Sequence, residues 1–406
     1  MTQGRVNVRG EGVHVARWTD WIDPRQVGWV RLLVVFIPIT AGAEWFGAPA
    51  IAVFLTAGLA IIPLAGLIGE STEALSCRVG PGLGGLLNAT FGNAAELIIA
   101  LFALAKGLDG VVKASLTGSI IGNLLLVLGA SLLAGGLRYP YQRFNRTAAS
   151  SGTTLMVLAA SGMILPALFH ELVAADADYA EHNLSLGVSL ILMITYGLSL
   201  LFSLKTHREL YNPEGDTVEE ALHGAAWGIR KSTIVLLAAT ALVAWMSEVL
   251  VGAVEEASHA LGLTEVFVGV IIVAIVGNAA EHSTAVIMAW KNQTDLALGI
   301  AMGSALQIAL FVAPVLVFCS YLRAEPMDLL FTPMEVAAVI LAVFLARMVV
   351  EDGESNWLEG AMLLMIYAIL GVAFFFLPAR HRSAFSDPIP AAAEVSPRPV
   401  SAPETR

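Results

Sequence analysis

Long apolar blocks separated by short polar connections run through most of the chain. Uncharged runs cover residues 45–69, 114–137, 147–169, 184–204, 296–322 and 360–379. A helix needs about 20 apolar residues to cross the hydrocarbon core of a bilayer, so these runs predict membrane-spanning helices. With the nearly uncharged stretches added, the pattern predicts eleven spans, near 30–46, 49–69, 82–105, 111–134, 147–169, 184–204, 232–254, 266–290, 295–319, 333–350 and 358–378. The expected fold class is an all-α polytopic membrane protein.

The composition supports this class and excludes several others. Of 406 residues, 14% are charged, against roughly 25% in soluble domains, and the mean hydropathy is +0.76. Most of the net charge of −11 lies in the connections between blocks, so we expect no nucleic-acid partner. Cys77 and Cys319 fit neither a disulfide framework nor a metal-binding spacing. The expected partner is the lipid bilayer, and a homo-oligomer is compatible with the sequence.

Lys and Arg residues set the expected orientation, because short cytoplasmic connections retain them. With the N-terminus inside, the inner segments carry 15 Lys and Arg, whereas the outer connections carry only Lys106, Lys113 and Arg323. We therefore expect a cytoplasmic N-terminus and an external C-terminus. The expected location is the cell membrane, either a plasma membrane or a bacterial inner membrane.

An internal repeat divides the chain. The pentapeptide GNAAE at 92–96 recurs unchanged at 277–281, an offset of 185 residues. The same offset relates Gly118-Ser119 to Gly303-Ser304, Gly84 to Gly269 and Glu70 to Glu255. Each half holds five predicted spans, an odd number, so the second half enters the membrane from the opposite side. This inverted-repeat plan is typical of secondary transporters, whose substrate site lies at the membrane midplane between the halves.

The expected organisation is one leading helix followed by two inverted five-helix repeats. Its segments are an N-terminal arm with the leading transmembrane helix (1–48), the first five-helix repeat (49–205), a cytoplasmic acidic linker (206–231), the second five-helix repeat (232–379) and a disordered C-terminal tail (380–406).

Two glutamates within otherwise apolar spans are the candidate site. Glu96 and Glu281 lie deep in their spans, where a charge is costly, and such residues are functional candidates by default. Ca²⁺ prefers six to eight oxygen ligands from carboxylates, amides, carbonyls and water. The candidate supporting ligands are Asn93, Asn278, Gly92, Gly277, Ser119, Asn123, Ser304, Gln307 and His282.

Burial makes it unfavourable for an empty site to hold both carboxylate charges, because desolvation and repulsion oppose them. Carboxylates must also lose their protons to bind a metal ion. Protons and Ca²⁺ would therefore compete for the same oxygens, which predicts antiport.

At these residues the chain resembles the cation/proton exchanger branch, the Ca²⁺:H⁺ antiporters, of the calcium/cation exchanger superfamily. The resemblance rests on GGLLNATFGNAAELIIALFAL (84–104) and GSIIGNLLLVLG (118–129), with VGVIIVAIVGNAAEHSTAV (268–286) and GSALQIALFVAP (303–314). It implies an eleven-span exchanger that moves Ca²⁺ out of the cytoplasm against entering protons. By motif position, Glu96 and Glu281 would bind the cation and exchange protons. Family members more often carry Ser where Gly122 stands, so this chain lacks that hydroxyl.

Several of these residues have a second interpretation. Asn93 and Asn278 could serve only as hydrogen bonds between helices. His282 is either a proton relay or a packed structural residue. The candidate gate residues, which could instead mark the membrane boundary, are Glu70, Glu73, Glu248 and Glu255.

Two rival functions remain open from the sequence. A Na⁺ or K⁺/proton antiporter would use the same carboxylates. An intramembrane metal-dependent hydrolase is disfavoured, because no His-Glu-x-x-His motif is present: His170-Glu171 is followed by Leu172-Val173-Ala174. We expect no enzyme activity and no cofactor, with Ca²⁺ bound only as transported substrate.

Overall fold

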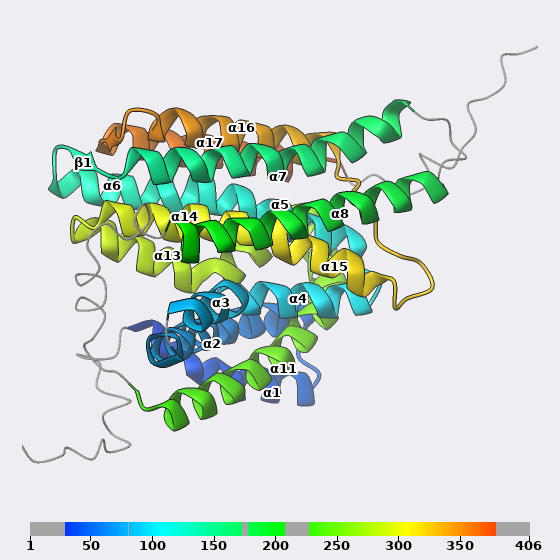
Figure 1. Ribbon diagram of the computed structural model, residues 1–406. Helices are drawn as coiled ribbons and strands as arrows, with labels where there is room; N and C mark the ends of the chain where they lie inside the picture. Colours follow the sequence, from blue (N-terminus) through cyan, green and yellow to red (C-terminus); the bar gives the residue numbers. More distant parts are fainter. Residues whose placement is uncertain (1–28, 80, 173–177, 208–226, 379–406) are drawn as a thin grey trace, which may run out of the picture.

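The computed structural model describes residues 29–79, 81–172, 178–207 and 227–378, and these residues are almost entirely helical (Figure 1). The α-helices of the first part are α1 (Phe36–Trp45), α2 (Ala50–Val79), α3 (Pro81–Phe91), α4 (Ala94–Ala105), α5 (Asp109–Ile121), α6 (Leu128–Arg138), α7 (Arg146–Leu172) and α8 (Asp178–Leu201). Those of the second part are α11 (Ile229–Leu261), α12 (Glu265–Phe267), α13 (Ala274–Trp290), α14 (Thr294–Gln307), α15 (Ala313–Ser320), α16 (Pro333–Val350) and α17 (Trp357–Phe375).

Short segments of other helix types join several of these α-helices. A 3₁₀ segment, η2 (Trp29–Val35), precedes α1. The π-helical segments are η3 (Gly122–Val127), η4 (Phe202–Thr206), η6 (Val268–Val273) and η7 (Ile308–Val312). Through η3, η6 and η7 the chain forms continuous helices over 109–138, 265–290 and 294–320. Such π-helical turns occur often at functional sites.

Nine helices of the described residues are long and apolar enough to cross a membrane. Two shorter apolar helices, Leu32–Trp45 and Ala94–Ala105, fall within the first and third predicted spans. These lengths confirm the predicted class, a helical polytopic membrane protein, while the count of eleven spans stays a prediction. The helices also run past several predicted limits: α11 has 33 residues and begins and ends beyond the predicted span 232–254.

The third predicted span, expected as one helix over 82–105, is instead two. Helix α3 ends at Phe91 and α4 begins at Ala94, with a turn at Gly92 and Asn93 between them. Asn93 has φ −105° and ψ 31°, outside the α-helical region. Glycine has high conformational entropy and asparagine competes for backbone hydrogen bonds, so this pair is a weak point in a helix. The repeated pair, Gly277 and Asn278, lies inside the uninterrupted helix α13.

The two halves of the sequence interleave in space. Helices α2 and α11, one from each half, pack along each other, and α1 packs on α2 (Figure 1). Helix α4 contacts α11 and α5, whereas α5 contacts η6 and α16. A site built from α4 and α13 therefore lies where the two halves meet.

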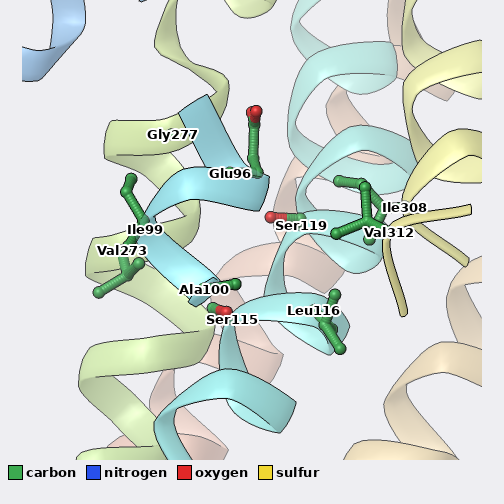
Figure 2. Close-up of a pocket in the computed structure, with 10 residues that line it drawn as sticks. All are labelled: Glu96, Ile99, Ala100, Ser115, Leu116, Ser119, Val273, Gly277, Ile308 and Val312. Carbon is green, nitrogen blue, oxygen red and sulfur yellow. The ribbon is translucent and has the colours of Figure 1, made fainter. Parts of the chain in front are cut away.

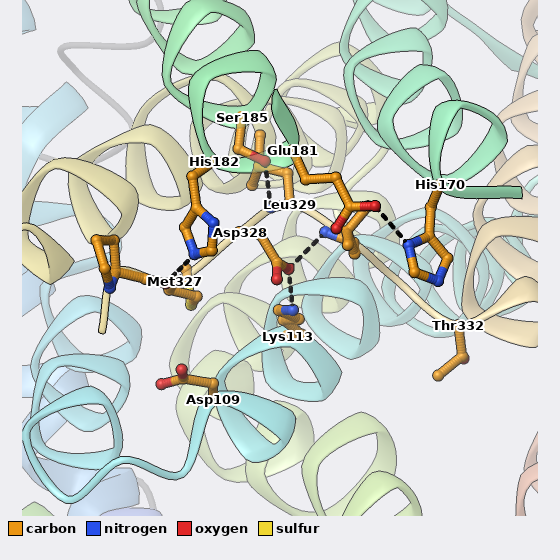
Figure 3. A network of polar contacts seen from close by, with 12 residues as sticks. Asp109, Lys113, His170, Glu181, His182, Ser185, Met327, Asp328, Leu329 and Thr332 are labelled. Carbon is orange, nitrogen blue, oxygen red and sulfur yellow. Dashed lines mark hydrogen bonds and ion pairs between the residues drawn. The ribbon is translucent and has the colours of Figure 1, made fainter. Parts of the chain in front are cut away.

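One face of α5 bonds to the connection between α15 and α16 and to the start of α16, and Figure 3 shows the link of Lys113 with Asp328. The three links are Asp109 with Arg323, whose Nη1–Oδ1 distance is 2.6 Å, Lys113 with Asp328, and Thr117 Oγ1 with Glu335 Oε1 at 3.0 Å. Glu335 is 2% exposed and also completes a capping box with Thr332 at the start of α16. These contacts fix α5 at the predicted outer end of the bundle.

Arg323 holds two elements of the first half together. Its guanidinium donates to the Leu104 carbonyl at 2.8 Å as well as to Asp109. The hydrogen bonds that Arg323 donates to the Asp109 carboxylate raise the pKa of Arg323 above its ordinary value, so its charge persists at every accessible pH. The α4–α5 turn is thereby tied to the second half.

The predicted cytoplasmic end carries the one exception to the all-α prediction within the described chain. Strand β1 (Gln142–Arg143) pairs antiparallel with β2 (Glu354–Ser355). The side chain of Gln142 donates to the Leu132 carbonyl at 2.8 Å. The pairing links the connection after α6 to that before α17.

Candidate cation-binding site

The two predicted glutamates approach each other across the boundary between the halves. Glu96 lies in the first turn of α4, and Glu281 lies near the middle of α13. A Cβ placed on Gly277 would be 3.1 Å from Cγ of Glu96, so the Glu96 side chain packs directly against the repeated motif on α13. Helices α4 and α13, which carry the two carboxylates, are in contact. The structure thus brings together residues 185 positions apart.

Six of the predicted neutral ligands form one hydrogen-bond network beside the glutamates. Ser304 donates to Asn93 Oδ1 at 2.9 Å, Asn278 donates to Ser119 at 2.9 Å, Asn123 donates to Asn278 Oδ1 at 3.0 Å and to Ser304 at 2.9 Å, and Asn93 donates to Gln307. Asn93, Asn123 and Asn278 are at most 2% exposed. Each motif asparagine thus pairs with the serine of the other half, and the network crosses the repeat boundary.

The network is symmetric only in part. Ser119 and Ser304 are related by the repeat offset and bind equivalent asparagines. The additional amides are not equivalent, because Gln307 corresponds to Gly122, and Asn123 corresponds to Ile308. The second half therefore supplies an amide at the position where the first half has glycine.

Three buried polar atoms in this region have no hydrogen-bond partner among the described residues. They are Oε2 of Glu281, Oδ1 of Asn123 and Nε2 of His282. Buried polar atoms are almost always paired, and an unpaired one marks a place for an ion or a water molecule. The two oxygens fit a hard cation, whereas the nitrogen does not.

A small cavity adjoins Glu96 (Figure 2). Its volume is about 10 Å³, and its polar lining comprises Glu96, Ser115 and Ser119, with apolar side chains of α4, α5, η6 and η7 around them. A site of this size holds about one water molecule. Ser115, which lies one turn before Ser119 on α5, was not among the predicted ligands, although its i, i+4 spacing from Ser119 indicates a shared helix face.

Equivalent glycines on the two sides of the site have different surroundings. A Cβ on Gly118 of α5 would lie 2.2 Å from the Val270 carbonyl oxygen, and one on Gly269 would lie 2.6 Å from Cβ of Ala114. Helix α5 and η6 are therefore in backbone contact on the predicted outer side. A Cβ on Gly303 of α14, the equivalent of Gly118, would meet no neighbouring atom of the described residues within 4 Å.

Helix α3, the counterpart of η6, packs elsewhere. A Cβ on Gly84 would lie 2.3 Å from the Ser76 carbonyl oxygen of α2, and Ser76 donates to the Gly84 carbonyl at 2.9 Å. A Cβ on Gly85 would lie 2.5 Å from Leu204 of η4. Thus α3 lies against its own half, and the face of α14 around Gly303 is left open.

The candidate gate residues do not join the glutamate site. Glu70 and Glu73 lie on α2, towards the predicted cytoplasmic end, and Glu248 and Glu255 lie on α11, towards the outer end. Glu70, Glu248 and Glu255 are exposed. Glu248 lines a separate cavity between α1, α2, α4 and α11. Their role as gates stays a prediction.

In the described part of the chain no three His, Cys, Asp or Glu side chains converge as a metal site would require. The candidate site therefore offers two carboxylates and neutral oxygens.

The fold is that of a polytopic helical membrane protein, and the sequence comparisons identify the family. The profile of the sodium/calcium exchanger protein family matches residues 49–205 and 231–376. The chain belongs to this family and, within it, to the cation/proton exchanger branch, as the sequence predicted. It is accordingly a transporter and not an enzyme.

Relatives of known name match over most of their length. The chain is 47% identical over 363 residues to the Ca²⁺/H⁺ antiporter of Aphanothece halophytica, covering 85% of this chain and 96% of the relative. It is 46% identical over 347 residues to the Ca²⁺/H⁺ antiporter ChaA of Bacillus subtilis, covering 85% and 98%. The solved structure of native YfkE superposes with a TM-score of 0.75 at 43% identity, covering 86% of this chain and 100% of YfkE.

Proposed function

We propose that the protein exchanges cytoplasmic Ca²⁺ for external protons at a midplane site formed by Glu96 and Glu281. The observation that carries the proposal is the packing of Glu96 against the motif of Glu281, beside one network of neutral side-chain oxygens. The relatives named as Ca²⁺/H⁺ antiporters support the choice of substrates. No resident cofactor is needed, because the ion is the cargo.

The proposed architecture is eleven spans, arranged as one leading helix and two inverted repeats. Nine long helices support it, together with two shorter ones at Leu32–Trp45 and Ala94–Ala105. The α3–α4 pair would form the third span, with its break at Gly92 and Asn93. The interleaving of α2 with α11 and of α5 with η6 agrees with two intertwined repeats. The segment boundaries and terminus locations remain part of the proposal; residues 208–226 of the acidic linker and the tail 380–406 lie outside the described residues.

The donor set suits Ca²⁺. Two carboxylates balance its charge of +2, and Asn93, Asn278, Ser119 and Ser304 would add amide and hydroxyl oxygens. The unpaired oxygens of Glu281 and Asn123 are available to an ion without breaking a hydrogen bond. The hydrogen bonds among the neutral ligands hold them in place, which reduces the entropy lost when the ion binds.

Coupling follows from competition for the carboxylates. Each glutamate must be deprotonated to hold the ion, so a loaded site carries Ca²⁺ and an unloaded site carries protons. Either cargo neutralises the buried charge. Only a site whose charge is neutralised switches readily between access from one side of the membrane and access from the other.

The described conformation faces the cytoplasm in this proposal. The backbone contact of Gly118 with Val270 closes the outer side, and the open face at Gly303 leaves the opposite side accessible. Straightening α3 at Gly92 and Asn93 would bring it against α14, as η6 now lies against α5. The inverted repeat thus supplies both states of an alternating-access cycle.

The test is transport in everted membrane vesicles with an acidic lumen. Ca²⁺ uptake should be coupled to proton efflux from the lumen, and Glu96→Gln and Glu281→Gln should each abolish it. The matched control is Glu351→Gln, because Glu351 is exposed at the predicted cytoplasmic end. Wild-type transport in either site variant would refute the site.

The same vesicles distinguish the rival substrates. Wild-type protein is supplied in turn with Ca²⁺, Mn²⁺, Na⁺ and K⁺ under an identical pH gradient. Movement of Na⁺ or K⁺ without Ca²⁺ would refute the substrate while leaving the architecture intact.

A further inference from the structure

A second cavity lies apart from the glutamate site, among α1, α2, α4 and α11. Its volume is about 470 Å³, within the roughly 300–1,000 Å³ range of small-molecule sites. Its charged lining consists of Glu44, Lys106, Glu248 and Glu256, and Trp245 also lines it. Nothing in the exchange cycle described above uses this cavity. We call it the outer cavity.

The charges of the outer cavity are not neutralised by one another. Among the described residues, Lys106 makes no salt bridge, and none of the three glutamates pairs with it. The Lys106 ammonium lies over α11, where a Cβ on Gly252 would be 3.0 Å from Nζ. Charges of both signs therefore face the same space without meeting.

This arrangement does not suit a metal ion. No three carboxylates converge within the described residues, so Glu44, Glu248 and Glu256 surround the cavity without sharing a point. An ammonium group within the cavity would also repel a cation. The fitting ligand is larger and carries both a negative and a positive group.

The depth of the cavity along α11 places it at the membrane interface. At a rise of about 1.5 Å per residue, Glu248 lies roughly 24 Å along the helix from Ser232. The hydrocarbon core is about 30 Å thick, so Glu248 and Glu256 bracket its predicted outer boundary. Trp245, which is 42% exposed, has the position and chemistry of an interfacial aromatic anchor.

An apolar stripe continues from the cavity towards the membrane centre. The face of α11 that lines the cavity extends one and two turns back to Ala241 and Leu237, and then to Ile234. All three are exposed, and Leu237 and Ile234 are 65% and 56% exposed. A ligand with a charged head in the cavity could therefore lay an acyl chain along this stripe.

We propose that the outer cavity binds a zwitterionic phospholipid with a primary ammonium headgroup, namely phosphatidylethanolamine. Its phosphate would accept hydrogen bonds from Lys106, and its ammonium would donate to the carboxylates of Glu44, Glu248 and Glu256. One bound lipid would span α1, α2, α4 and α11. Its binding would hold the leading helix against the repeats.

The first test compares lipids on the wild-type protein in detergent. Lipid binding is measured by native mass spectrometry and by the rise in unfolding temperature. Phosphatidylethanolamine should bind about tenfold more tightly than phosphatidylcholine, whose trimethylated nitrogen donates no hydrogen bond to the carboxylates. Phosphatidylglycerol, which lacks the ammonium, should also bind weakly. Equal binding of all three lipids would overturn the proposal, and a preference for phosphatidylglycerol would indicate an anion site instead.

Variants test whether phosphatidylethanolamine binds in the outer cavity. Lys106→Gln and Glu256→Gln should each weaken phosphatidylethanolamine binding about tenfold. Gly252→Leu should block it by filling the cavity. The matched controls, Lys291→Gln and Glu351→Gln, alter exposed charges at the other end of the bundle and should bind normally. Normal lipid binding by Gly252→Leu would overturn the location.

One further measurement separates a lipid from a cation. Ca²⁺ binding is measured without lipid in the Glu96→Gln/Glu281→Gln double variant, where the exchange site is disabled. We expect no binding that depends on Glu256. Binding that is lost on adding Glu256→Gln would show that the outer cavity is a cation site and would overturn the proposal.

Discussion

The two copies of the GNAAE motif have the same sequence and different structures. In the first half, the helix breaks at Gly92 and Asn93, and α3 turns away to pack on α2. In the second half, Gly277 and Asn278 continue an unbroken helix whose preceding segment, η6, packs on α5. An identical pentapeptide therefore does not impose one backbone. The difference shows two alternative arrangements of the same motif side by side in one molecule.

The difference also affects the electrostatics of the two glutamates. Glu96 lies in the first turn of α4, where the free backbone N–H groups and the helix dipole favour a negative charge. Glu281 lies within a continuous helix and has no such terminus beside it. If the halves exchange conformations during transport, this environment passes from one glutamate to the other.

The largest expected effect concerns pH. Ca²⁺ affinity should fall as pH falls, because protons occupy the carboxylates that the ion needs. Where both glutamates bind protons, the decrease should approach about 100-fold per pH unit, which is one factor of ten for each proton displaced. Single Glu→Gln variants that retain weak binding should approach about tenfold. Equilibrium Ca²⁺ titrations between pH 5 and 9 measure these slopes, and an affinity that did not change with pH would contradict shared use of the carboxylates.

The next effect tests the open face of α14. Gly303→Leu should fold normally, because a Cβ there meets no neighbour, yet slow Ca²⁺/H⁺ exchange at least tenfold by preventing α3 from docking. Gly118→Ala should instead destabilise the protein by about 1–3 kcal/mol, because its methyl group would overlap the Val270 carbonyl.

Thermal unfolding in detergent and vesicle transport rates measure both outcomes. Gly299→Ala is the control for Gly303→Leu, because a Cβ on Gly299 of α14 also meets no neighbouring atom of the described residues within 4 Å. Equal loss of stability in Gly118→Ala and Gly303→Ala would show that the two glycines have equivalent surroundings.

A smaller effect concerns the two asparagines. Asn93→Ala and Asn278→Ala should each weaken Ca²⁺ binding about tenfold, because each removes one oxygen ligand and releases the serine of the other half. Ser283→Ala, an exposed change on α13, is the control. Calorimetric Ca²⁺ titration separates the two interpretations: lower stability with unchanged affinity would mean that the asparagines only join helices.

The smallest effect concerns the outer attachment of α5, whose ion pairs have no counterpart on α14 among the described residues. Asp109→Asn should lower the free energy of unfolding by about 1 kcal/mol, because it weakens a partly buried ion pair with Arg323. The positions of α14 that correspond to Asp109, Lys113 and Thr117 are Thr294, Leu298 and Met302. Chemical denaturation measures the change, and an unchanged transport rate per folded molecule is expected.

The sequence was sufficient to predict the class of fold, and it indicated which residues to examine as a candidate site. Hydrophobic blocks alone predicted the long helices, because lipid requires uninterrupted apolar segments of nearly fixed length. The repeated motif identified Glu96 and Glu281, and the 23-residue spacing from each to Ser119 and Ser304 predicted that the serines belong nearby. The structure places those serines against the asparagines of the opposite half.

Other features could not be obtained from local pattern. The break in the third span was not predicted, because its residues are the same as those of the unbroken copy. The links from α5 to Arg323, Asp328 and Glu335 join residues more than 200 positions apart, so no local spacing indicates them. The outer cavity likewise requires four helices from separate parts of the chain.

The sequence by itself predicted that the chain crosses a membrane repeatedly, that the GNAAE motif occurs twice at an offset of 185 residues and that each copy places a glutamate within an apolar span. These features depend on composition and order along the chain. Charges and unpaired backbone groups are costly to bury in lipid, so the long apolar segments become the membrane-spanning helices. Only the tertiary structure decided that the asparagines bind the serines of the opposite half and that α5 contacts η6 while α14 remains open. Packing between helices decides such choices, because two nearly equivalent arrangements of one motif can differ in energy only through what each helix contacts.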